Sequence, residues 1–152
     1  MKQQKKVTRI PLVVDETGNI TIMGLVSHDP DYKVSLSINR ILGISLRNIS
    51  PFELTGPKAV TTTYSRFRDS SDPHGLIYTL VSNRNGNSHL VRKLVNIDYL
   101  FFLQVPDQIP DSDSLAASLR DIDGITAVFN INCITIQPDL LDQMLNQENL
   151  RI

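Results

Sequence analysis

The run Leu100-Phe101-Phe102-Leu103 is the sequence feature that most constrains the fold. Four consecutive apolar residues, bounded by Asp98 and Pro106, are typical of a short strand that is covered on both faces. A strand with one exposed face would alternate apolar and polar residues instead. The pattern therefore predicts a central strand over about 97–105, with core on either side of it.

The segment from Asp29 to Gly43 carries the end signals of a helix. Its apolar residues fit either an alternating strand over 32–38 or one face of a helix, so periodicity alone leaves both open. Asp29 can accept a hydrogen bond from a first-turn amide, and Pro30 has a preset φ for the first helical position. Gly43 can end a helix in the left-handed conformation. These signals predict a helix over about 30–42.

The remaining patterns indicate further strands and helices. We expect strands at 10–14 and 19–26, joined in a hairpin by the turn 15–18, and others at 44–49, 60–67, 76–82, 125–130 and 133–137. Pro51 and Gly56-Pro57 indicate a loop, and Asn85-Gly86 a hairpin turn after which 90–94 returns. Ser112 is expected to cap a helix that is broken by Gly124, and Pro138 to open a last one.

These elements together predict an α+β fold: a single domain with a mostly antiparallel sheet and about three helices. The order strand, helix, strand over 98–130 is long enough for a crossover, as in half of a ferredoxin-like unit. A length of 152 residues with 41% hydrophobic content suits one domain over 10–152, preceded by a flexible basic terminus at 1–9.

Charge is divided unevenly along the chain. Up to residue 97 there are 13 Lys or Arg against 7 Asp or Glu, and from residue 98 onward 2 against 9. Opposed charge of this kind favours internal pairing over a nucleic-acid surface, which needs clustered positive charge. The single cysteine, Cys133, excludes an intramolecular disulfide. Without a signal peptide or an apolar run of membrane-spanning length, the cytoplasm is the expected compartment and no membrane partner is expected.

Motifs for catalysis, cofactors or metals are not found. Glycine-rich phosphate loops do not occur, and no cofactor is predicted. The histidines are expected in exposed loops, and Cys133 is expected to be a small buried apolar residue. The carboxylates near the 112 helix fit helix capping and solvation better than a calcium site, since no twelve-residue calcium loop is present. The histidines are His28, His74 and His89, and the carboxylates are Asp107, Asp111, Asp113, Asp121 and Asp123.

Tyr64, Arg66 and Arg68 mix aromatic and cationic side chains, a combination that can stack bases on a sheet. Because side chains alternate along a strand, these three share one face while Phe67 points to the other. The alternation predicts Phe67 in the core and both arginines in solvent. RNA binding by this face is kept as a weak second alternative.

Two segments resemble a known family. Val91-Arg92-Lys93 followed by Ile97-Asp98-Tyr99 resembles the signature of the IPExxxVDY family, small uncharacterised proteins of Bacteroidetes bacteria, with Arg92 and Lys93 standing at its Pro and Glu positions. Asp31-Tyr32-Lys33, with Leu36, Asn39, Leu42 and Gly43, is similar to that family's helix. The resemblance implies a small bacterial domain and brings no activity with it.

No residue set specifies a reaction, so the leading hypothesis is a non-enzymatic domain that acts through an unknown protein partner or as a homodimer. The alternative is a small-ligand regulatory or enzymatic domain with a pocket near the central strand 97–105. Asp98, Tyr99 and Arg92 are the predicted ligand-binding residues of that pocket.

Overall fold

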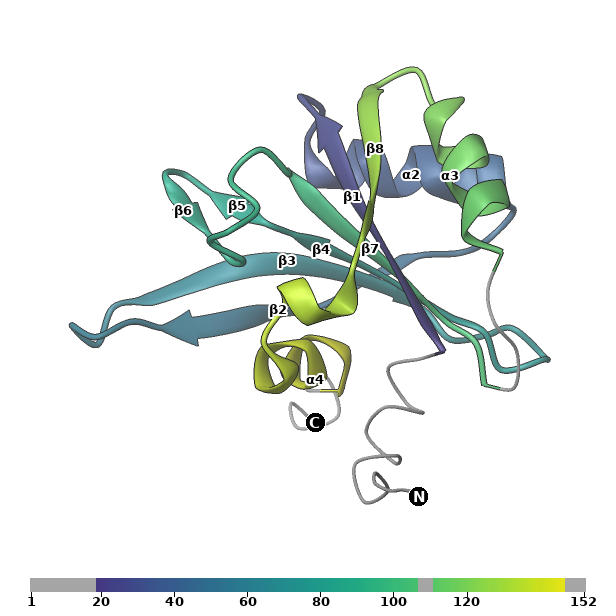
Figure 1. Ribbon diagram of the computed structural model, residues 1–152. Coiled ribbons are helices and arrows are strands. Elements are labelled where there is room, and N and C mark those ends of the chain that lie inside the picture. The colour runs from purple at the N-terminus through teal and green to yellow at the C-terminus, as the bar shows by residue number, and fades with distance from the viewer. Residues whose placement is uncertain (1–18, 107–110, 147–152) are drawn as a thin grey trace, which may run out of the picture.

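A computed structural model describes residues 19–106 and 111–146 (Figure 1). The expected basic terminus at 1–9 and the expected strand at 10–14 lie outside these residues. The predicted partner of 10–14 in a hairpin, the strand at 19–26, is β1 (Ile20–Ser27). Among the described residues, β1 pairs with β7 on one side and with β8 on the other.

The main element is a six-stranded sheet with strand order β2-β3-β4-β7-β1-β8, in which every neighbouring pair is antiparallel. The other strands of this sheet are β2 (Arg47–Thr55), β3 (Thr61–Asp69), β4 (Ile77–Ser82), β7 (Tyr99–Gln104) and β8 (Ile125–Ile131). A small hairpin, β5 (Arg84–Asn85) with β6 (Ser88–His89), follows β4. The helices are α2 (Asp31–Leu42), α3 (Ser112–Arg120) and α4 (Pro138–Asn146), and η1 (Cys133–Thr135) is a 3-10 turn. The predicted single α+β domain with a mostly antiparallel sheet is confirmed.

The predicted central strand is β7, which lies between β4 and β1. Leu100, Phe101 and Phe102 each have 0% exposed surface, so both faces of the strand are covered. Phe101 belongs to the core cluster on the side of α2 and α3, whereas Leu100 and Phe102 belong to the cluster on the side of α4. Figure 1 shows the helices divided in this way between the two faces of the sheet.

The crossover from β7 through α3 to β8 is also confirmed. Both β7 and β8 run antiparallel to β1, which lies between them, so they are parallel to each other as a split pair. This connection places β8 at one edge of the sheet, and β2 forms the other edge.

Helix α2 has the predicted extent, but a different N-cap. Gly43, at φ 67°, ends the helix in the left-handed conformation and donates its N–H to the Asn39 carbonyl (2.8 Å). The N-cap residue is Pro30, and the carboxylate of Asp29 forms an ion pair with Lys33 (3.5 Å) instead of accepting a first-turn amide. The helix start therefore depends on the proline backbone and not on a side-chain cap.

Several predicted boundaries were wrong for local reasons. The cap of α3 is Asp111, whose carboxylate accepts the Ser114 N–H (3.1 Å), one residue before Ser112. Strand β2 continues through Pro51, which an edge strand tolerates at its irregularity between Ile49 and Phe52. The segments 90–94 and 133–137 are not strands: the first is a loop of turns and the second contains η1.

Candidate functional site

Most of the segment that resembles the family signature, residues 91–97 of 91–99, is a loop held by one buried side chain. Asn83 is fully buried, and its amide donates to the Leu94 and Ile97 carbonyls (2.9 Å each). Its side-chain oxygen accepts the Val91 N–H (2.8 Å). Asn83 therefore fixes the loop at three main-chain groups. The sequence indicated a hairpin turn here and gave no signal for this role.

Asp98 and Tyr99 both form hydrogen bonds with other segments of the domain. The Asp98 carboxylate accepts the Ser27 N–H (2.9 Å) and pairs with Arg84 (2.9 Å). The Tyr99 hydroxyl donates to the Asp29 carbonyl (2.6 Å). Burial, with smaller contributions from nearby carboxylates, raises the pKa of Tyr99 to about 12, so this hydroxyl stays protonated at neutral pH.

Arg92, the third predicted ligand-binding residue, lies elsewhere. It is exposed and lines an open hollow of about 430 Å³ between the β2–β3 hairpin and the loop after β6. Neither Asp98 nor Tyr99 lines that hollow. Arg92 therefore does not share this hollow with Asp98 and Tyr99, and ligand binding by the three as a set stays a prediction.

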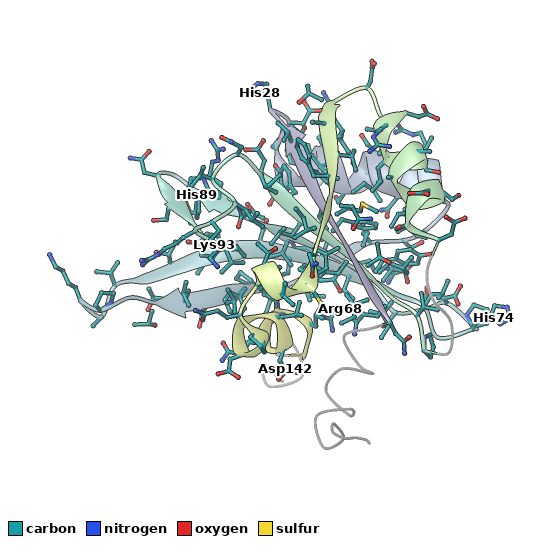
Figure 2. All side chains as sticks on the ribbon, viewed as in Figure 1. His28, Arg68, His74, His89, Lys93 and Asp142 are labelled. Atoms are coloured by element: carbon teal, nitrogen blue, oxygen red, sulfur yellow. The ribbon has the colours of Figure 1, made fainter. Side chains whose placement is uncertain are left out.

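Tyr64, Arg66 and Arg68 share one face of β3 as predicted, but that face is covered, and α4 lies over its two arginines. Arg66 is 0% exposed and donates to the Ser50 carbonyl (3.0 Å) and the Met144 carbonyl (2.8 Å). Arg68 donates to the Leu145 carbonyl at the end of the same helix, and Figure 2 shows it beside α4. The expectation that both arginines are solvated was wrong, because the C-terminal carbonyls of a helix attract guanidinium groups.

The burial of these side chains affects the prediction that this face binds RNA. Tyr64 is only 2% exposed, so neither it nor Arg66 presents a face to a base. RNA binding by these residues stays an untested prediction without a surface to support it. Phe67 is in the core, as expected.

The remaining candidate residues are the histidines, Cys133 and the carboxylates near α3. His28 and His74 are exposed at the periphery of the molecule (Figure 2), whereas His89, predicted to be exposed, is half-buried. Cys133 is partly buried and packs against the core cluster that contains the apolar residues of α4. Over 19–106 and 111–146, no group of three or more His, Cys, Asp or Glu could hold a metal ion. Asp107 lies outside the described residues, and Asp113, Asp121 and Asp123 are exposed.

The two edges of the sheet differ in how well they are protected against pairing with another strand. Edge strand β2 contains Arg47, Pro51 and Glu53 and has an irregularity in mid-strand. Charges, proline and irregular backbone are the devices that proteins use to protect an edge. Strand β8 has the sequence Ile-Thr-Ala-Val-Phe-Asn-Ile, without charge, proline or glycine. We therefore take β8 as the candidate interaction site.

Main-chain groups of β8 face away from the sheet at two positions. The Leu25 carbonyl of β1 accepts the Asp98 N–H on the β7 side, so Leu25 turns its main chain away from β8. Its partner in β8, Val128, therefore points its own N–H and C=O outward, as does Asn130 two residues on. The register shift of this pairing lies near Thr126, which leaves 127–131 as the regular part of the edge.

The side chains at this edge include an exposed aromatic ring. Phe129 is 50% exposed, and Ile134, just after the strand, is 83% exposed. Arg120, at the end of α3, donates to the outward Val128 carbonyl (3.3 Å), so this acceptor of the edge is already engaged. The sequence predicted strand 125–130 but held no signal that it would be an edge strand.

Comparisons with known proteins add no further information: no family model matches the chain, and no curated protein matches it. Among the described residues, no helix has the length and apolar character needed to cross a membrane.

Proposed function

We propose that this domain acts by self-association, in which β8 pairs antiparallel with β8 of a second copy. The observation that carries the proposal is the contrast between the two edges, because only β8 lacks proline and charge within the strand. An uncharged edge with outward main-chain donors and acceptors is a template for strand addition. A second copy supplies an identical edge, so the interface is symmetric.

The outward groups select one register. Val128 of one copy pairs with Asn130 of the other, and the reverse, so that outward N–H groups meet outward C=O groups. Phe129 then faces Phe129 of the second copy across the two-fold axis, in a pair that is not hydrogen-bonded and in which side chains approach most closely. Aromatic pairs of this kind contribute about 0.5–1.5 kcal/mol beyond the area they bury. If the two-fold axis passed through Val128 instead, Thr126 would have to pair with Asn130 of the other copy. Thr126 lies where the register between β1 and β8 shifts, so this pairing is less regular.

The proposal is tested by disulfide crosslinking at the two-fold axis. In a Cys133→Ser background, which removes the single native cysteine, Phe129→Cys places two thiols in a directly opposed pair. Cα atoms in such a pair are about 4.5 Å apart, within the range that a disulfide spans. We expect a covalent dimer under mild oxidation, measured by non-reducing electrophoresis.

Asn130→Cys in the same background is the matched control. Its two copies would be diagonal neighbours about 7–8 Å apart, which is too far for a disulfide. We expect a dimer with Phe129→Cys and none with Asn130→Cys. Equal crosslinking of both variants, or a strictly monomeric mass of the unmodified protein by light scattering at high concentration, would refute the pairing.

We also propose that the chain belongs to the IPExxxVDY family, that it is non-enzymatic and that it acts in the cytoplasm. What supports family membership is the resemblance of 91–99 and 31–43. Purification of the tagged protein from its native host would test the self-association, since a different, stoichiometric partner recovered with it would favour the heteromeric reading.

A further inference from the structure

The hollow near Arg92 has both apolar and polar lining residues. The apolar ones are Leu54 and Val60 of the β2–β3 hairpin and Val95 of the loop after β6, which are 37%, 63% and 52% exposed. These residues belong to a small set of exposed large hydrophobic side chains in the described structure, yet they gather around one hollow. Exposed apolar groups that converge in this way are typical of a ligand or partner site.

The polar lining residues include Tyr64, Ser88, His89 and Arg92 and contain no acidic group. Burial raises the pKa of the Tyr64 hydroxyl, and the positive charge of Arg92 acts on it in the opposite direction. The Nε2 atom of His89 is buried and has no hydrogen-bond partner among the described residues. No Asp or Glu lines the hollow, and no described carboxylate forms an ion pair with Arg92.

Together these lining residues define the chemistry of a ligand. A guanidinium and a phenol hydroxyl suit a carboxylate, because charge-assisted hydrogen bonds to Arg are strong and can be bidentate. The apolar lining residues suit a short hydrocarbon chain attached to that carboxylate. The volume of about 430 Å³ falls within the range of small-molecule sites.

We propose that this hollow binds a small amphiphilic carboxylate, with its carboxylate at Arg92 and Tyr64 and its hydrocarbon tail against Leu54, Val60 and Val95. The site lies at the β2–β3 end of the sheet, away from β8, so it is independent of the self-association proposed above. It also lies apart from the predicted pocket beside Asp98 and Tyr99.

The experiment is a titration with octanoate, followed by two-dimensional amide NMR on the full chain. We expect saturable shifts in residues around 54–64 and 87–95. Octanamide, which has the tail but no charge, and acetate, which has the charge but no tail, should each bind at least about tenfold more weakly. One lost charge-assisted hydrogen bond of ~1.5–3 kcal/mol corresponds to about tenfold or more in affinity.

Arg92→Gln and Lys93→Gln form a matched pair of variants. Both residues are exposed and carry the same charge, but only Arg92 lines the hollow. Figure 2 shows Lys93 and His89 in the part of the molecule that faces the β2–β3 hairpin. We expect Arg92→Gln to weaken octanoate binding about tenfold and Lys93→Gln to leave it unchanged. Equal effects of the two variants, or no saturable binding of octanoate at millimolar concentration, would overturn the proposal.

Discussion

Replacing Asn83 by Ala tests whether one buried amide holds the loop 91–97. The change removes the hydrogen bonds to Val91, Leu94 and Ile97, all of 2.8–2.9 Å. At a net value of about 1 kcal/mol each, three bonds give a loss of about 3 kcal/mol, and more if water does not reach the groups left behind. This is a large part of a typical domain stability of ~5–15 kcal/mol.

Urea unfolding followed by circular dichroism measures this loss. With a slope of about 1–3 kcal/mol per molar urea, the midpoint of Asn83→Ala should fall by about 1–3 M. Asn85→Ala is the control, because Asn85 is exposed and its amide donates to the Thr63 carbonyl at the surface (2.7 Å); its loss should stay near 0.5 kcal/mol. A loss below about 1 kcal/mol for Asn83→Ala would show that apolar packing holds the loop without the amide.

Further predictions concern the core, alkaline pH and the β8 edge. Leu100 is fully buried, so Leu100→Ala should cost about 2–5 kcal/mol in urea unfolding, whereas His28→Ala and His74→Ala should stay within about 0.5 kcal/mol. The pKa of Tyr99 is raised by folding from 10.0 to about 12, so its stabilising effect is complete below pH 10 and is lost as the pH rises through 12. Tyr99→Phe should therefore make the fall in urea midpoint over this window shallower, and an unchanged fall would contradict this. Arg120→Gln uncovers the Val128 carbonyl and should tighten self-association about two- to tenfold, as measured by sedimentation; this corresponds to ~0.5–1.5 kcal/mol for the hydrogen bond that pairing must displace.

The sequence by itself determined those elements whose causes lie within a few residues. The apolar run at 100–103 identified the central strand, since a strand without polar alternation has no face to turn to solvent. Gly43 marked the end of α2, because the left-handed cap is a local backbone requirement. The order of elements over 98–130 was enough to predict a crossover, but not that β1 would lie between the two strands it connects.

Only the tertiary structure decided the features that depend on residues far apart in the chain. Arg66 looked like a solvated strand residue, but its guanidinium donates to Met144, which is 78 residues away. Asn83 looked like part of a turn, and its partners lie 8 to 14 residues further on. Strand β8 became an edge because β1 had already paired with β7 on its other side. Whether a charged side chain is buried, and whether a strand lies at an edge, depends on which segments pack together. The residue pattern within one segment does not specify which distant segments those are.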